Sequence, residues 1–140
     1  MSRLFLDSSV LFAAAYSPRG HAHDLIRMAI RREIVVVASS LVLTETKRNL
    51  AESAPEYLVL LDYILENIPF ELFQPTKREV VAATRYTALK DAPIVAAARK
   101  AKVDFLVALD KKHPLGKPDL AEYVGAEILT PKEAFVRLTR

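Results

Sequence analysis

A chain of 140 residues, 51% of them hydrophobic, can bury a core, and this length predicts one domain spanning residues 1–140. The absence of cysteine excludes disulfide bonds, zinc–thiolate sites and thiol nucleophiles. No apolar run reaches the roughly 18 residues of a membrane span, and no signal peptide is visible, so we expect a cytoplasmic protein without a membrane partner. The net charge of +3 permits polyanion binding without requiring it.

The chain alternates between short apolar runs and amphipathic segments. Its first half predicts a strand at 3–6, helices at 10–16 and 22–32, a strand at 34–37, helices at about 39–52 and 56–66, and a strand at 70–73. Its second half predicts a helix from residue 76 to about 87, a helix at 91–100, a strand at 104–109, a loop at 113–119, a strand at 126–129 and a helix opened by a capping box at 130–133. Continuously apolar strands that alternate with helices predict a central parallel sheet in a three-layer α/β/α, Rossmann-like fold.

Four carboxylates stand at the boundaries of these elements. Asp7 and Asp110 each follow an apolar strand, Asp91 opens a helix, and Glu45 lies in the first two turns of another helix. In a parallel α/β sheet, ligands bind beyond the carboxyl ends of the strands, and one such edge can collect all four residues. Together they would form a cage of hard oxygen ligands suited to Mg²⁺ or Mn²⁺.

Each acid taken alone also has a structural explanation. Asp7 can serve a strand-to-helix turn, and Glu45 can be a solvated helix residue. Asp91 can be an N-cap, and Asp110 can pair with the lysines that follow it. Only the joint placement of the four residues at element boundaries favours a shared site.

The motifs around these acids resemble those of PIN-domain nucleases, in particular the toxin components of prokaryotic toxin–antitoxin pairs. The resemblance covers nearly the whole chain and rests on LDSSVL at 6–11, LVLTE at 41–45, DAPIVAAA at 91–98, VDFLVALD at 103–110 and ILTPKEAF at 128–135. One position departs from the pattern, because Ala108 stands where the fourth motif usually has Thr or Ser. The resemblance also implies that Ser9 orients Asp7 or a metal-bound water, although Ser9 can equally be a helix cap.

This resemblance implies a metal-dependent endoribonuclease that hydrolyses phosphodiesters in single-stranded RNA. Asp7, Glu45, Asp91 and Asp110 would be direct or water-mediated ligands of one or two Mg²⁺ or Mn²⁺ ions. Basic residues beside the acids would attract the RNA, and the chain offers Lys47, Arg48, Lys90, Lys111, Lys112 and Lys117. The aromatic residues are scattered along the sequence and predict no platform for base stacking.

The resemblance further implies two protein partners, an antitoxin and a second copy of the chain. The apolar segment 56–66, with Leu58, Leu60, Leu61, Ile64 and Leu65, is either the homodimer interface or part of the core. Two alternatives to the toxin remain open. One is a non-catalytic RNA- or protein-binding module with the same fold, and the other is an RNA-processing or DNA-structure nuclease that is not a toxin.

Overall fold

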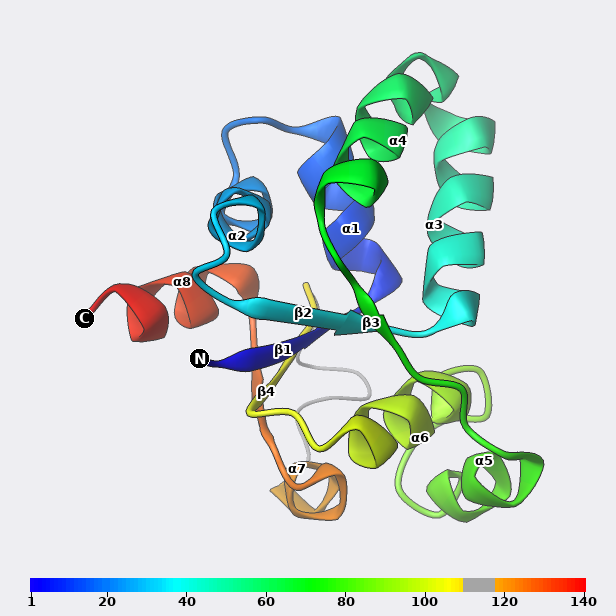
Figure 1. Cartoon of the computed structure of the whole chain (residues 1–140). Helices are drawn as coiled ribbons and strands as arrows, with labels where there is room; N and C mark the ends of the chain where they lie inside the picture. Colours follow the sequence, from blue (N-terminus) through cyan, green and yellow to red (C-terminus); the bar gives the residue numbers. More distant parts are fainter. Residues whose placement is uncertain (110–117) are drawn as a thin grey trace.

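The central sheet lies between two layers of helices in the computed structural model, which describes residues 1–109 and 118–140 (Figure 1). Its five strands pair in parallel in the order β3-β2-β1-β4-β5. They are β1 (Arg3–Leu6), β2 (Val35–Ala38), β3 (Glu71–Leu72), β4 (Phe105–Val107) and β5 (Glu127–Leu129). The predicted three-layer α/β/α fold with a parallel sheet is therefore confirmed.

The helices divide between the two faces of this sheet, as Figure 1 shows. One face carries α1 (Ser8–Tyr16), α2 (His21–Ile30), α3 (Ser40–Ser53), the 3₁₀ helix η1 (Pro55–Tyr57), α4 (Leu58–Asn67) and α8 (Pro131–Thr139). The opposite face carries α5 (Lys77–Ala83), α6 (Ala92–Ala101) and α7 (Pro118–Val124). Across the described ranges 1–109 and 118–140, no helix has the length and apolar character needed to cross a bilayer.

The central strands are apolar on both sides because both sides are covered. Leu4, Phe5 and Leu6 of β1 are completely buried, and Leu106 and Val107 of β4 are nearly so. On the α6 side, the small residues of an alanine-rich helix pack closely, and all but one of the residues between Ala92 and Ala98 are buried. Full burial on two faces removes the apolar–polar alternation of a half-exposed strand, which is why these strands are recognised by composition.

Several boundaries differ from the predictions. Helix α1 begins at Ser8 rather than at residue 10, and η1 precedes α4 where one helix was expected. Helix α5 ends at Ala83 instead of about residue 87, because the next turns close with short i to i+3 hydrogen bonds such as Tyr86 N–H to the Ala83 carbonyl at 3.0 Å. Strand β4 covers Phe105–Val107, which is shorter than the strand predicted at 104–109.

Helix α7 was missed, and the loop predicted to end at residue 119 is wrong over its last two residues. The helix begins at Pro118, and Asp119 lies in its first turn, where an acid is favourable. Leu120 and Val124, four residues apart, are both buried against the core. That spacing is the feature of the sequence that could have predicted this helix. Two apolar residues in a seven-residue helix form only a weak amphipathic pattern.

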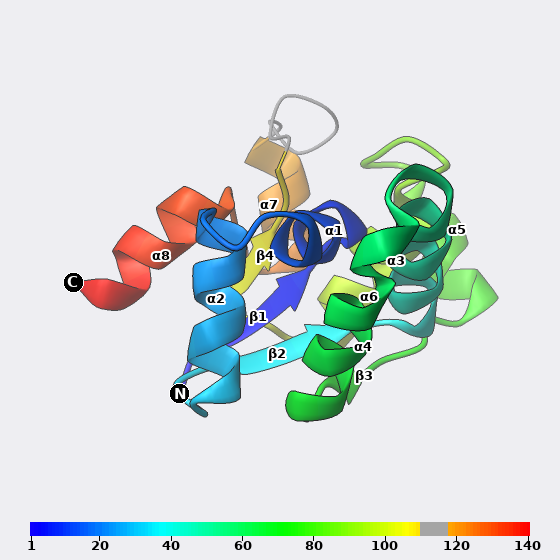
Figure 2. The ribbon, with the colours of Figure 1, turned by 90° about the horizontal axis from the view of Figure 1, so that it is seen from above.

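The strand order reverses beside β1, and this places a switch point at the centre of the sheet. The first crossovers carry the chain from β1 to β2 and then to β3, whereas β4 pairs with the other side of β1. The backbone N–H of Asp7 continues this pairing by donating to the Val107 carbonyl at 3.0 Å. Seen from above, the ends of β1 and β4 and the link between α5 and α6 lie on the same side of the molecule (Figure 2).

Candidate active site at the carboxyl edge of the sheet

Asp7 lies directly beyond the carboxyl end of β1, at the position that precedes α1. Its side chain makes no capping hydrogen bond to that helix. The contact expected of an aspartate that only serves the strand-to-helix turn is therefore absent. Instead, the Ser9 hydroxyl donates to Asp7 Oδ2 at 2.7 Å. The backbone N–H of Leu109 in turn donates to Ser9 Oγ at 3.4 Å. Ser9 therefore holds the Asp7 carboxylate and links it to the chain that leaves β4.

Glu45 lies in the second turn of α3, which starts at the carboxyl end of β2. The Ser39 hydroxyl accepts from the Val42 N–H at 3.2 Å, and this N-cap fixes where the helix begins. Thr46, the next residue, is buried and donates back to the Val42 carbonyl at 2.7 Å. The Glu45 Oε1 atom is buried without a hydrogen-bond partner among residues 1–109 and 118–140. A buried carboxylate oxygen in this state needs a proton or a cation.

Asp91 immediately precedes α6 and is partly buried. Although it occupies the N-cap position, its backbone is helical and its side chain makes no capping hydrogen bond to α6. Pro93 has no backbone N–H, and a residue in the first turn of a helix needs none for the helical hydrogen bonds. The start of α6 therefore has one fewer N–H group that requires a capping acceptor. The simple N-cap explanation for Asp91 is therefore not supported by its contacts.

The remaining predicted residues lie outside the described part of the chain. These are Asp110 and the nearby Lys111, Lys112 and Lys117. Ala108, the departure from the fourth motif, is buried at the end of β4, and its N–H donates to the Leu129 carbonyl at 3.0 Å. Asp104 lies at the other end of β4, where its carboxylate accepts from the Arg3 N–H at 2.8 Å. Asp104 thus lies at the amino end of β4, at the edge of the sheet opposite to Asp7.

The charges of the three described acids act on one another. Partial burial and the negative charge of Asp7 raise the pKa of Glu45 above its ordinary value, Asp91 raises this pKa further, and the Arg48 guanidinium lowers it. Carboxylates perturb one another in this way only when they are near neighbours. The fold therefore places Asp7 and Asp91, which are 84 positions apart in the sequence, near enough to Glu45 to affect its pKa.

The donor set suits a hard divalent cation, which would neutralise this repulsion. Within residues 1–109 and 118–140, no three Asp, Glu, His or Cys side chains are close enough to hold a metal ion together. The described acids are thus near enough to influence the pKa of Glu45 without forming a compact cage. The buried Oε1 of Glu45 is the feature that fits a cation most directly.

Sequence reasoning missed one polar group near these acids. Thr87, in the link that leads to Asp91, has a buried hydroxyl oxygen without a hydrogen-bond partner among the described residues. No spacing or composition distinguishes this threonine in the sequence.

Comparison with known proteins agrees with this geometry. The model of the PIN domain family matches residues 3–112. The chain belongs to the PIN-domain family. A comparison with curated protein sequences finds no match.

Solved structures share the PIN-domain fold at low sequence identity. PAE2754 from Pyrobaculum aerophilum has a TM-score of 0.65 and 20% identity, covering 99% of this chain and 97% of that one. VapBC2 from Rickettsia felis, bound to a DNA fragment from its promoter, has a TM-score of 0.65 and 14% identity, covering 91% and 98%. VapC20 from Mycobacterium tuberculosis, described as a Sarcin-Ricin loop cleaving toxin, has a TM-score of 0.60 and 20% identity, covering 78% and 91%.

Proposed function

We propose that this PIN domain is a metal-dependent endoribonuclease that hydrolyses phosphodiesters in single-stranded RNA. The observation that carries the proposal is the Oε1 atom of Glu45, which is buried without a hydrogen-bond partner in the described residues. Burial and the charges of Asp7 and Asp91 also raise the pKa of Glu45, which agrees with this position. Carboxylates placed near one another repel, and a bound divalent cation would neutralise this repulsion and explain why the acids lie there. The fold relative VapC20 is described as a Sarcin-Ricin loop cleaving toxin, which supports a related activity here.

In this proposal Asp7, Glu45, Asp91 and Asp110 are direct or water-mediated ligands of one or two Mg²⁺ or Mn²⁺ ions. The bound metal would activate water and stabilise negative charge on the scissile phosphate. Asp7 is oriented for this role by the Ser9 hydroxyl at 2.7 Å. Glu45 presents a buried oxygen whose charge is poorly solvated and therefore available to a cation.

Basic residues near the acids would offset the repulsion between the cluster and the RNA backbone. Arg48 follows Glu45 by three residues in α3, and its positive charge lowers the pKa of Glu45. Lys47 and Lys90 are exposed beside Glu45 and Asp91. Lys111, Lys112 and Lys117 follow Asp110 in the sequence and would add to the same positive surroundings.

We further propose that the enzyme is a toxin held inactive by an antitoxin. The structural relatives include the VapBC2 assembly and FitAcB from Neisseria gonorrhoeae, which has a TM-score of 0.62 and 15% identity. The chain covers 98% of the matched chain in both cases. The two alternatives, a non-catalytic binding module and a processing or DNA-structure nuclease, remain outcomes of the experiment below.

The decisive experiment incubates purified protein with fluorescent single-stranded RNA or DNA of the same sequence in Mg²⁺, Mn²⁺ or EDTA. Asp7→Asn and Asp91→Asn variants test the site, and Asp62→Asn is the matched control because Asp62 is an exposed residue of α4. Each site variant should lower the cleavage rate at least about 100-fold. Mutation of a residue that only hydrogen-bonds a metal ligand can already cost about 100-fold in activity, and loss of the ligand itself should cost no less. The control should cleave at the wild-type rate.

The outcomes separate the possible functions. RNA cleavage that requires metal and both aspartates supports the nuclease, and cleavage of DNA structures in preference to RNA supports the processing alternative. Folded protein that binds RNA in EDTA but cuts neither polymer with metal supports the binding module. Metal binding that is unaffected by Asp7→Asn and Asp91→Asn would refute the proposed site whichever substrate is cut.

A further inference from the structure

A second charged feature lies on the face of the molecule formed by α5, α6 and α7. A cavity of about 500 Å³ opens there, away from the residues that follow β1 and β2. Four of its lining side chains are cations and one is a carboxylate. Its charged and aromatic lining residues are Arg78, Glu79, Arg99, Lys100, Lys102 and Tyr123. This excess of positive charge makes the cavity suited to an anion.

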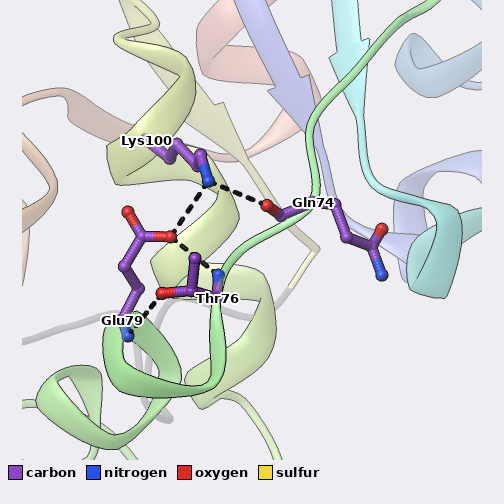
Figure 3. Close-up of polar contacts among 4 residues, drawn as sticks. All are labelled: Gln74, Thr76, Glu79 and Lys100. Carbon is purple, nitrogen blue, oxygen red and sulfur yellow. Dashed lines mark hydrogen bonds and ion pairs between the residues drawn. The ribbon is translucent and has the colours of Figure 1, made fainter.

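The single carboxylate of the lining is already engaged. Glu79 Oε1 accepts from the Thr76 N–H at 2.7 Å and from Lys100 Nζ at 3.1 Å (Figure 3). Lys100 also donates to the Gln74 carbonyl at 3.0 Å. These contacts connect the start of α5 to the end of α6 along one side of the cavity. They also leave the other three cations of the cavity without a carboxylate in its lining.

Arg99 is held in position by an aromatic stack. Its guanidinium lies 4.3 Å from the centre of the Tyr123 ring and donates to the Tyr123 carbonyl. The Tyr123 ring in turn stacks on Tyr86, with ring centroids 4.1 Å apart and planes 15° apart. A guanidinium has five N–H donors, so a group fixed by one carbonyl keeps donors for a ligand and loses little freedom on binding.

Arg78 and Lys102 complete the positive lining. Both are exposed, and the side chain of neither makes a hydrogen bond or ion pair with another residue in the described part of the chain. Lys102 ends α6 with a φ of 54°, a left-handed conformation that glycine adopts more readily. The chain thus has a long cation at a position where the backbone would favour glycine.

The cavity and the acidic edge lie toward opposite ends of α6. Asp91 precedes the first residue of this helix, and Lys100 is its next-to-last residue. Nine residues of helix at about 1.5 Å each separate them by about 13 Å along the axis. That distance corresponds to about four phosphates of a stacked strand at about 3.4 Å each. A short run of nucleotides can therefore reach from one feature to the other.

We propose that this cavity is an exosite that binds backbone phosphates of the RNA strand cut at the acidic edge. The inference rests on the proposed nuclease function, which requires a polyanionic substrate at an edge whose own carboxylates repel it. Forked guanidinium groups match phosphate oxygens, and the lining contributes two of them. A strand anchored here would offset the repulsion at the acidic edge without placing a cation against the carboxylates.

The test measures binding without cleavage. A fluorescent single-stranded RNA of about 16 nucleotides, the upper range for single-strand binding folds, is titrated with protein in EDTA over a series of salt concentrations. The cavity variant is Arg78→Gln with Lys102→Gly, which removes two cations and relieves the left-handed lysine. The control is Arg27→Gln with Arg31→Gln, which removes the same charge from exposed positions at the end of α2, on the other face of the sheet.

We expect the cavity variant to bind at least about tenfold more weakly and its salt slope to fall by about 1 to 2, as for the loss of one or two phosphate contacts. The control should change much less, and both variants should unfold near the wild-type temperature. Equal weakening in the two variants would mean that net charge alone governs binding and would overturn the exosite. So would wild-type affinity in the cavity variant.

Competitors distinguish the source of the phosphate. Inorganic phosphate and adenosine monophosphate should displace the RNA poorly, because a single phosphate contacts only part of the cavity. Efficient displacement by either, lost in the cavity variant, would overturn the strand exosite in favour of a small-molecule site. Displacement by an acidic peptide as effective as by unlabelled RNA would likewise overturn it in favour of a protein partner.

A cleavage assay separates this inference from the proposed function. If the enzyme cuts RNA, the cavity variant should lose kcat/KM on the long substrate but retain it on a dinucleotide that covers only the cut site. If no RNA is cut under any condition, the nuclease proposal fails, while the EDTA titration still decides whether the cavity binds the strand. Loss of dinucleotide cleavage in the cavity variant would refute an exosite role.

Discussion

Glu45 shows how the environment of one residue can indicate a site. Burial and the neighbouring Asp7 raise its pKa, and its Oε1 is buried without a hydrogen-bond partner in residues 1–109 and 118–140. Both observations describe a carboxylate that is more costly to ionise in the folded chain than in water. The surrounding helix would be more stable with an uncharged residue, so the acid is better explained by a bound cation than by stability.

Replacement of Glu45 by Gln should therefore stabilise the metal-free protein and abolish its response to metal. In EDTA the thermal midpoint of Glu45→Gln should exceed that of wild type, because the repulsion from Asp7 and Asp91 is gone. The free energy of unfolding of the wild type should rise by about 2.7 kcal/mol when Mn²⁺ is present at about 100 times its Kd. Glu52→Gln, at an exposed position of the same helix, is the control. An equal metal response in both variants would contradict the role assigned to Glu45.

Ser9 is expected to act through Asp7 rather than on the substrate. Ser9→Ala removes the 2.7 Å hydrogen bond to Asp7 Oδ2 and should reduce metal affinity or cleavage by about 10- to 100-fold. Ser8→Ala in the same first turn of α1 is the control. Isothermal titration with Mn²⁺ measures the affinity directly. If both substitutions weaken binding equally, the effect belongs to the start of the helix and not to the Ser9–Asp7 contact.

At the scale of elements, two helices start with the same local device. In α5 the Thr76 hydroxyl accepts from the Glu79 N–H at 3.1 Å while Glu79 accepts from the Thr76 N–H at 2.7 Å. In α8 the corresponding bonds join Thr130 and Glu133 at 3.2 and 2.9 Å. The capping box at 130–133 was predicted from sequence and is confirmed, because a capping box depends only on residues three apart.

The box in α5 carries a pH-dependent contribution to stability. The Thr76 N–H and the Lys100 ammonium hold the pKa of Glu79 below its ordinary value of 4.5. A lowered pKa stabilises the fold above pH 4.5, and this contribution is lost as the pH falls through the lowered value. Urea unfolding should therefore show Glu79→Gln to be less stable than wild type at pH 7, with the difference shrinking toward pH 3. A difference that stays constant with pH would contradict the assigned contacts.

The hydroxyl of the same box can be tested separately. Thr76→Ala should destabilise the protein by about 1 kcal/mol, the usual cost of losing an N-cap, whereas Thr76→Ser keeps the acceptor oxygen and should cost much less. Chemical denaturation at neutral pH measures both. If Ser and Ala are equally destabilising, the methyl group of Thr76 matters more than its hydroxyl.

At the scale of the whole molecule, the shared sheet and core support the proposal that residues 1–140 form one domain. Segment 56–66 was expected to be either the homodimer interface or part of the core, and Leu61 and Ile64 of α4 are buried in the core. Three large apolar residues of α4 are exposed, namely Val59 at 77%, Tyr63 at 55% and Leu60 at 46%. Val59 and Tyr63 are four positions apart and share one face of the helix. An exposed apolar face of this kind is a candidate for the proposed dimer.

Charge placed on that face should disrupt the dimer. Val59→Glu with Tyr63→Glu is expected to shift the protein to a monomer, measured by size-exclusion chromatography with light scattering over a concentration series. Val81→Glu, at an exposed apolar position of α5 on the opposite face, is the control and should leave the mass unchanged. A wild-type protein that is monomeric at every concentration would refute the homodimer itself.

Much of this architecture could be predicted from local sequence. The apolar runs at β1, β2 and β4, the N-cap at Ser39 and the capping box of α8 each depend on residues that are neighbours in the chain. The parallel order of the strands follows from their alternation with helices. The positions of the acids at element boundaries were likewise readable, because the carboxyl end of a buried strand can be located from composition alone.

Tertiary structure decided which of these residues meet. Tyr86 and Tyr123 are far apart in the sequence but stack in the fold, and the packing of α5, α6 and α7 gathers the cations of the cavity. The burial of Leu61 and the shifted pKa of Glu45 likewise depend on residues distant in sequence. The sequence by itself determined the elements and the kinds of side chain at their ends, because these depend on local periodicity and capping. Contact, burial and charge coupling are long-range properties, and only the folded chain could determine them.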